Sequence, residues 1–218
     1  MKINALFILL FVTAGLVSCD KEKDYNYADG TVGRSKIVNF PLIETKGDKL
    51  IILTQGATYT EAGANATLGG ATTTYTTAGT VNTAQGGVYN LTYTASNPEG
   101  YTASDWRTVV VIGNDVSANN FSGTYLRAAT GVTSTWTKTA NGIYTLENPG
   151  GAGVGAGLTV IAVNYSGTKI SIPHQISNDF GEVSSGSESY TLTPAPPQYS
   201  LVFFAGGYGT GVRTFVKQ

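Results

Sequence analysis

The sequence is poor in the side chains that most often bind metals or act as catalytic nucleophiles and bases. It contains one cysteine, Cys19, and one histidine, His174. A zinc site of the usual kinds takes three or four ligands, drawn mainly from cysteine and histidine, and a disulfide joins two cysteines. We therefore assign no metal and no cofactor, and we expect packed sheets rather than disulfides to stabilise the fold.

Charge is also scarce. Asp, Glu, Lys and Arg make up 12% of the residues, against the ~25% that is usual in soluble proteins, and the formal net charge is −1. A surface that binds nucleic acid needs a basic stripe, so we expect no nucleic-acid partner. Helical bundles need more Ala, Glu, Lys and Leu than this chain provides. Its 31 threonines, 28 glycines and 13 tyrosines instead favour half-buried strands joined by turns, and predict an all-β protein.

No catalytic motif surrounds the remaining candidates. His174 follows Pro173 in a strand-like segment, with no nucleophile signature beside it. The glycine-rich segment 150–157 lacks the Lys-Ser/Thr ending of a phosphate-binding loop and runs on into a strand-like stretch. Asp179 and Glu182 share one loop, but any polar turn brings acids together in this way. The same pair, or Asp115 with Asn114, offers oxygen ligands that could hold Ca²⁺, but the spacing is not that of an EF-hand. We expect a structural histidine, a surface loop at 150–157, no catalytic residues and no enzyme activity.

The amino-terminal segment carries the clearest motif. Lys2 precedes the apolar run 5–12 (ALFILLFV), which is shorter than a helix that crosses a ~30 Å bilayer core, and this pattern is typical of an export signal. The run ends in Leu16-Val17-Ser18-Cys19, which resembles the lipobox of bacterial lipoproteins. The resemblance implies removal of residues 1–18, acylation of Cys19 and stable anchoring to membrane lipid through several acyl chains.

Residues 19–35 form a polar segment that begins Cys19-Asp20-Lys21-Glu22-Lys23-Asp24. Such a composition favours a flexible tether. The acidic positions beside the cysteine resemble the surface-export signal of lipoproteins of the Bacteroidota. We therefore expect an outer-membrane lipoprotein that faces the cell surface, with a periplasmic orientation as the alternative.

Residues 36–113 show the pattern of a small β-sandwich. Within 88–95, Tyr89, Leu91, Tyr93 and Ala95 alternate with polar residues, which predicts a strand with one buried face. The other strands expected in this part lie at 37–42, 50–53, within 71–83 and at 106–112.

Three segments of this part, 56–64 (GATYTEAGA), 87–95 (GVYNLTYTA) and 107–111 (RTVVV), resemble the Ig-like domain family first noted in a bacterial pesticidal crystal protein. That family is common in surface lipoproteins of the Bacteroidota. The resemblance implies an Ig-like β-sandwich that acts as a spacer or adhesion module and carries no catalytic residues.

A polar break at 113–120 marks the start of a second domain, 114–218. About eight short strands at regular spacing favour a closed or nearly closed antiparallel sheet. They are expected at 121–127, 133–138, 142–146, 158–163, 169–172, 189–192, 199–204 and 212–216, the last two joined by a glycine-rich hairpin. The segments 121–125 (FSGTY) and 172–175 (IPHQ) and this hairpin resemble the C-terminal β-barrel-like domains, of unknown function, of the same lipoproteins. The predicted fold class is therefore all-β, an Ig-like β-sandwich followed by a second antiparallel β-barrel or sandwich domain.

Aromatic rings are the remaining candidates for ligand contacts. A flat ring with a polar tip packs against the C–H faces of a sugar while Asn and Thr groups bind its hydroxyls. Rings beside polar, Gly- or Ser-rich residues include Trp106 and Tyr101, and the candidate contacts are Tyr208, Trp136, Tyr165 and Tyr199. Tyr208, at the tip of the hairpin, is expected to be the most exposed. For each ring the alternative is a place in the core.

These observations predict a lipid-anchored cell-envelope protein. The family resemblance implies systems that capture complex glycans, so non-catalytic glycan binding is the leading function, with polysaccharide or outer-membrane glycan-uptake proteins as partners. The alternative is a structural or adhesion module in which the Ig-like domain spaces a domain that binds protein. A shallow groove lined by Trp or Tyr would favour a sugar, and an open apolar patch would favour a protein.

Overall fold

The computed structural model describes residues 31–32, 35–153, 157–193 and 195–218. Cys19 and the expected signal segment lie outside the described residues. The chain divides into two compact units, Met1–Asn39 and Phe40–Gln218. In the first unit, β1 (Thr31–Val32) pairs antiparallel with β2 (Ser35–Lys36).

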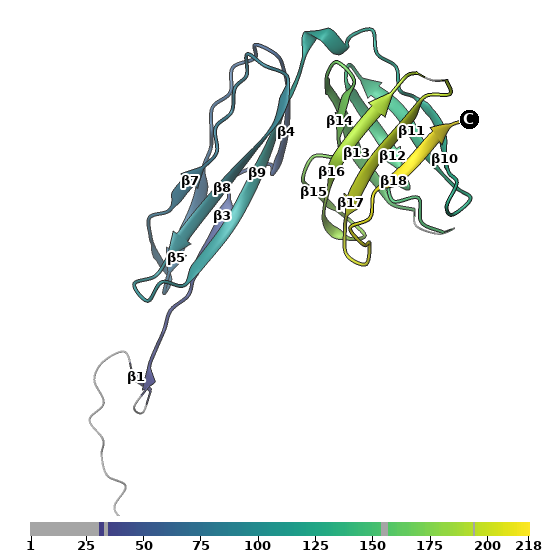
Figure 1. Ribbon diagram of the computed structural model, residues 1–218. Coiled ribbons are helices and arrows are strands. Elements are labelled where there is room, and N and C mark those ends of the chain that lie inside the picture. The colour runs from purple at the N-terminus through teal and green to yellow at the C-terminus, as the bar shows by residue number, and fades with distance from the viewer. Residues whose placement is uncertain (1–30, 33–34, 154–156, 194) are drawn as a thin grey trace, which may run out of the picture. The chain divides into compact units, whose positions relative to one another are not determined.

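The second unit begins with seven strands in two sheets (Figure 1). The strands are β3 (Pro41–Thr45), β4 (Leu50–Thr54), β5 (Ala64–Leu68), β6 (Ala71–Thr72), β7 (Thr76–Ala78), β8 (Gly87–Ser96) and β9 (Thr102–Ile112). One sheet has the order β3-β5-β6 and the other β4-β9-β8-β7, in which β4 runs parallel to β9. The two sheets form a β-sandwich.

The predicted faces of β8 are confirmed at most positions, because Leu91, Tyr93 and Ala95 are buried while Asn90 and Thr92 are exposed. Tyr89, expected on the buried face, is half-buried instead. The strand expected at 37–42 is wrong: β3 begins at Pro41, a residue without an N–H group, which suits the first position of a strand. β5 was not predicted, because its buried residues, Ala64 and Ala66, have low β propensity.

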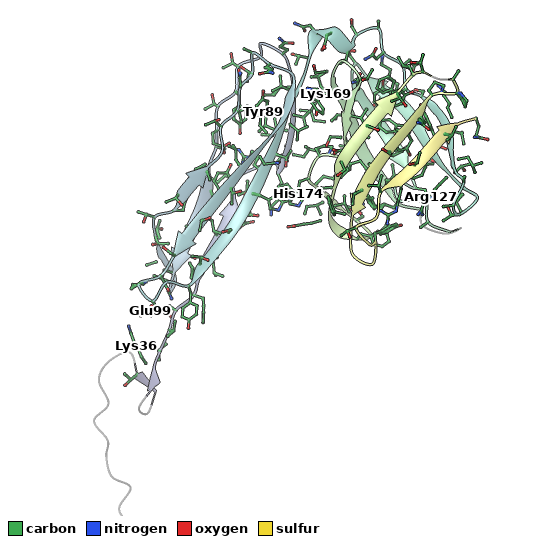
Figure 2. The ribbon with its side chains drawn as sticks, viewed as in Figure 1. Lys36, Tyr89, Glu99, Arg127, Lys169 and His174 are labelled. Atoms are coloured by element: carbon green, nitrogen blue, oxygen red, sulfur yellow. The ribbon has the colours of Figure 1, made fainter. Side chains whose placement is uncertain are left out.

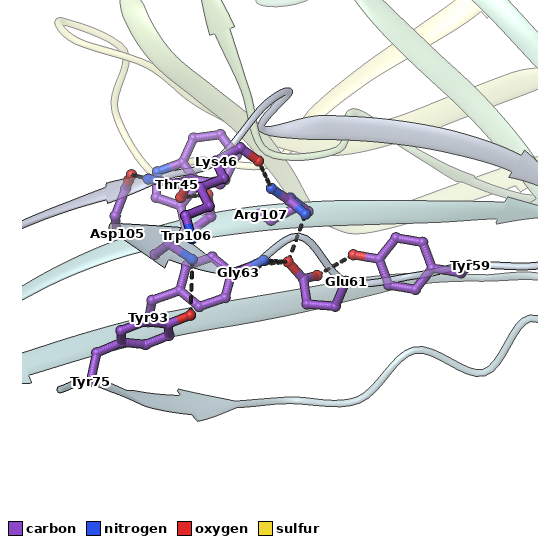
Figure 3. Close-up of polar contacts among 11 residues, drawn as sticks. Thr45, Lys46, Tyr59, Glu61, Gly63, Tyr75, Tyr93, Asp105, Trp106 and Arg107 are labelled. Carbon is purple, nitrogen blue, oxygen red and sulfur yellow. Dashed lines mark hydrogen bonds and ion pairs between the residues drawn. The ribbon is translucent and has the colours of Figure 1, made fainter. Parts of the chain in front are cut away.

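The interior of the sandwich holds a fully buried arginine, Arg107, drawn in Figure 3. Arg107 on β9 is 1% exposed; its Nη1 donates to Glu61 Oε1 at 2.6 Å and its Nη2 to the carbonyl oxygen of Lys46. Glu61 also accepts hydrogen bonds from the hydroxyls of Tyr59 and Tyr93 and from the N–H of Gly63. Burial raises the pKa of Glu61, but these hydrogen bonds and the charge of Arg107 outweigh burial and hold the pKa below its ordinary value.

The rest of the unit is one antiparallel sheet of nine strands. They are β10 (Gly123–Arg127), β11 (Val132–Ala140), β12 (Ile143–Glu147), β13 (Thr159–Ser166), β14 (Lys169–Ser171), β15 (Gln175–Ser177), β16 (Gly181–Thr191), β17 (Gln198–Phe204) and β18 (Arg213–Lys217). Their order is β14-β13-β12-β11-β10-β18-β17-β16-β15. The sheet curls until β14 meets β16, where the N–H of Ser185 donates to the carbonyl oxygen of Ile172 at 3.0 Å. The result is a half-barrel, and the predicted fold class is confirmed.

Aromatic rings fill this half-barrel. The ring centroids of Trp136 and Tyr144 lie 5.4 Å apart, those of Trp136 and Tyr199 5.3 Å apart, and Tyr199 stacks on Phe215 at 4.6 Å. The buried hydroxyls find acceptors, since Tyr199 donates to Ser134 Oγ at 3.0 Å and Tyr125 to a main-chain carbonyl at 2.7 Å. Large rings thus supply the core and the tyrosine hydroxyls stay hydrogen-bonded, whereas the buried Nε1 of Trp136 has no hydrogen-bond partner among the described residues.

A further apolar cluster joins the end of β9 to β13. It contains Ile112, Val163 and Val116, the last from the short 3₁₀-helix η1 (Asn114–Val116). Beside this cluster, the N–H of Gly113 donates to the carbonyl oxygen of Tyr165 at 2.9 Å. Among the residues described, no helix has the length and apolar character needed to cross a membrane.

Replacing Arg107 with Met tests the interior ion pair. Loss of a buried partner typically costs about 3 kcal/mol or more. Lys49→Met is the matched control, because Lys49 pairs with Asp105 near the surface, where such a pair contributes about 1 kcal/mol or less. Hydrogen exchange of the β8 and β9 amides measures the loss of stability in each variant within the same strands. Equal losses of stability in the two variants would contradict the central role of Arg107.

Candidate functional site

An open pocket of about 340 Å³ lies over the outward face of β8 and β9. Its lining residues are Asn90, Leu91, Thr92, Ser104, Asp105, Trp106 and His174. A second pocket of about 220 Å³ shares Asn90 and His174 and continues along Ser171, Ser184 and Ser185. Because the two pockets share these residues, they form one surface, named here the Trp106–His174 groove.

A stacked pair of rings forms one wall of the groove. The ring of Trp106 lies on the imidazole of His174, labelled in Figure 2, with centroids 3.5 Å apart and planes 19° apart. Glu182 fixes both rings, because its Oε1 accepts from Trp106 Nε1 at 3.0 Å and its Oε2 lies 3.2 Å from His174 Nε2. The hydrogen bond from Trp106, followed by the proximity of His174, lowers the pKa of Glu182. The carboxylate is therefore ionised at neutral pH.

A second ion pair borders the rings. Lys49 Nζ binds Asp105 and lies 5.1 Å from the centroid of the Trp106 ring. Burial raises the pKa of Asp105, but the hydrogen bonds from Lys49 and from the main-chain N–H of Thr45 outweigh burial and lower it. The lining of the groove thus includes one carboxylate, that of Asp105, whose charge is partly balanced by Lys49.

Neutral polar groups line the floor. Asn90 Oδ1 accepts from Thr108 Oγ1 at 2.9 Å, which orients the amide and leaves its NH₂ group for the groove. Thr92 and Ser104 add hydroxyls, and Ser104 Oγ lies 2.9 Å from Thr94 Oγ1. Amide, hydroxyl and carboxylate groups beside fixed aromatic rings suit a ligand that is rich in hydroxyls.

Within the described part of the chain, His174 contacts Glu182 and Trp106, and no hydroxyl donates to its ring. Over the same residues, no group of three or more His, Cys, Asp and Glu side chains is placed to hold a metal ion.

Two of the four rings predicted as ligand contacts belong to the core. Trp136 is 2% exposed and Tyr199 is 0% exposed. A ring that solvent does not reach cannot contact a ligand at the surface, so for these two residues the alternative interpretation, a place in the core, is correct.

The other two rings are half-buried. Tyr165 packs against the apolar cluster that joins β9 to β13, and burial raises its pKa. Tyr208 lies at the β17–β18 hairpin, as predicted, but it packs edge-on against Phe203 and Phe180, so it is less exposed than expected. Their contact with a ligand stays a prediction. Sequence reasoning missed the pairing of Trp106 with His174, because no local pattern connects a strand residue with a loop residue so far along the chain.

With this geometry in place, comparisons with known proteins identify the first part of the unit. Residues 43–111 match a family model described as bacterial surface protein, Ig-like domain. The β-sandwich is thus a bacterial surface Ig-like domain, as the resemblance in the sequence implied. A comparison with curated proteins gave no match.

The solved structures that are similar to the chain include the following two. One is a lipoprotein from Bacteroides thetaiotaomicron, 24% identical, with 82% of this chain and 100% of that chain covered and a TM-score of 0.37. The other, from Clostridium perfringens ZmpB, comprises the M60 catalytic domain with the CBM51-1 and CBM51-2 domains. It is 12% identical, the match covers 62% of this chain and 15% of that chain, and the TM-score is 0.29.

Fluorescence quenching tests where the two tryptophans lie. In Trp106→Phe the remaining emission comes from the buried Trp136, so we expect it to be blue-shifted and to resist quenching by acrylamide. In His174→Ala the emission should become easier to quench, because the imidazole no longer covers Trp106. Strong quenching in Trp106→Phe would contradict the burial of Trp136.

Proposed function

We propose that this protein is a lipid-anchored cell-surface module that binds complex glycans, without catalysis, at the Trp106–His174 groove. The observation that carries the proposal is the stacked ring pair set among amide, hydroxyl and carboxylate groups. The match of residues 43–111 to surface Ig-like domains fits a non-catalytic module of the cell surface.

The physical argument rests on the fixed geometry of the wall. Glu182 holds Trp106 and His174 in place before any ligand arrives, so binding costs little side-chain entropy. The C–H face of a sugar packs against this ring pair where it lines the pocket. The Asn90 amide and the hydroxyls of Thr92 and Ser104 then bind its hydroxyl groups.

The protein-binding alternative rests on a different surface. Leu42 on β3 is 70% exposed, and Phe40 and Tyr101, also exposed, lie 5.0 Å apart between ring centroids. Exposed apolar groups of this size mark a surface that favours a protein partner. The residues of this patch are distinct from those of the groove, so substitutions separate the two functions.

A glycan array on the protein, followed by calorimetry with the strongest ligand, tests the groove. We expect Asn90→Ala to weaken binding about tenfold, since an orienting hydrogen bond contributes about 1.4 kcal/mol. Leu42→Ser is the control and should bind as tightly as the wild type. If no polysaccharide binds while the fold is intact, glycan binding is wrong. If Leu42→Ser instead abolishes recognition of a protein partner, the adhesion alternative is correct.

Replacing Cys19 with Ser tests the anchor. The acyl chains proposed on the Cys19 sulfur and amine would be lost, so the protein should move from the membrane fraction to the soluble fraction. Protease treatment of intact cells that carry the wild-type chain distinguishes a surface orientation from a periplasmic one. Unchanged retention of Cys19→Ser in the outer membrane would contradict lipidation.

A further inference from the structure

Two arginines lie at one end of the half-barrel without an acidic partner. Arg127, labelled in Figure 2, ends β10, and Arg213 begins β18. Arg213 is 8% exposed, and Arg127 is half-buried. Among the described residues, neither Arg127 nor Arg213 lies within ion-pair distance of a carboxylate.

Main-chain carbonyls alone hold these guanidinium groups. Arg127 Nη1 donates to the carbonyl oxygens of Gly151 at 3.1 Å and Gly150 at 3.4 Å. Arg213 donates from Nη1 to Gly211 at 3.2 Å and from Nη2 to Gly209 at 3.3 Å, while its buried Nε has no partner. Carbonyl dipoles orient the two side chains but supply no formal negative charge.

Glycines allow this end of the sheet to close around the arginines. A Cβ atom on Gly150 would collide with the ring of Tyr208, and one on Gly151 would lie 2.7 Å from Arg127 Cδ. Gly151 also has a φ of +54°, which disfavours other residues. The ring of Tyr208 also packs against Arg213, with its centroid 5.5 Å from Arg213 Cζ.

The arrangement costs free energy, because a buried cation without an acidic partner is poorly solvated. Burial, and then the charge of Arg127, lower the pKa of Arg213. A bound anion would offset both the poor solvation of the buried Arg213 guanidinium and its repulsion by Arg127. A guanidinium group presents its donors in a planar fork that matches the oxygens of a carboxylate or a sulfate.

We propose that Arg127 and Arg213 bind the oxyanion of an acidic saccharide, a uronic acid carboxylate or a sulfate ester. The saccharide part rests on the proposed glycan-binding function, whereas the anion site stands on the arginines alone. The site shares no residue with the Trp106–His174 groove. A long glycan with acidic and neutral residues would therefore have two separate points of contact with the chain.

Calorimetry on the protein tests this with four probes: an oligogalacturonate, a sulfated glycosaminoglycan fragment, a neutral malto-oligosaccharide of the same length, and sodium sulfate. We expect at least one acidic oligosaccharide to bind at least tenfold more tightly than the neutral one and than inorganic sulfate. Arg127→Gln should abolish this preference, and Arg127→Lys should restore part of it. Arg213→Gln should also abolish the preference. Because Arg213 is buried, this variant can fail to fold, and the two Arg127 variants then test the proposal alone.

Two controls separate this site from other effects. Lys169→Gln removes the same charge from an exposed position on β14 and should leave the preference intact. Asn90→Ala should weaken binding at the groove and leave the acidic preference unchanged, so failure of one site is distinguishable from failure of the other. The proposal is wrong if neither acidic oligosaccharide binds more tightly than the neutral one, if Arg127→Gln leaves the preference unchanged, or if inorganic sulfate binds as well as the acidic oligosaccharides.

Discussion

The buried guanidinium of Arg107 is the constraint on which the sandwich depends. Its Nη1 donates to Glu61 and its Nη2 to the chain after β3, which ties the sheet of β3 to β9, while its buried Nε has no partner among the described residues. Neighbouring residues of a strand point to opposite faces. Fixing Arg107 inward therefore fixes Trp106 outward, and the core of the sandwich determines where the ring of the groove stands.

The half-barrel supplies the other wall by a different device. The hydrogen bond between Ser185 and Ile172 closes the curl, and the short segment that follows Ile172 carries His174 to the Trp106 ring. Glu182, on the neighbouring strand β16, then binds both rings. The hydrogen bond that closes the half-barrel thus also positions His174 beside the surface of the Ig-like domain.

The sequence reveals what depends on local periodicity. The alternation in 88–95 predicted the buried face of β8, and glycines predicted the β17–β18 hairpin. Trp136 and Tyr199 show the limit, because each lies in a strand whose neighbours are polar on both sides, and only the partner strands decide which face is buried. The groove and the Arg127–Arg213 pair were beyond prediction for the same reason, since each joins residues that only tertiary structure brings together.

The strand order of the half-barrel has a consequence for how the chain folds. β18 lies between β10 and β17, so the first strand of this sheet pairs with the last. Until residues 213–217 have been synthesised, β10 has an unpaired side in what will become the middle of the sheet. Pairing between segments so far apart is intrinsically slow.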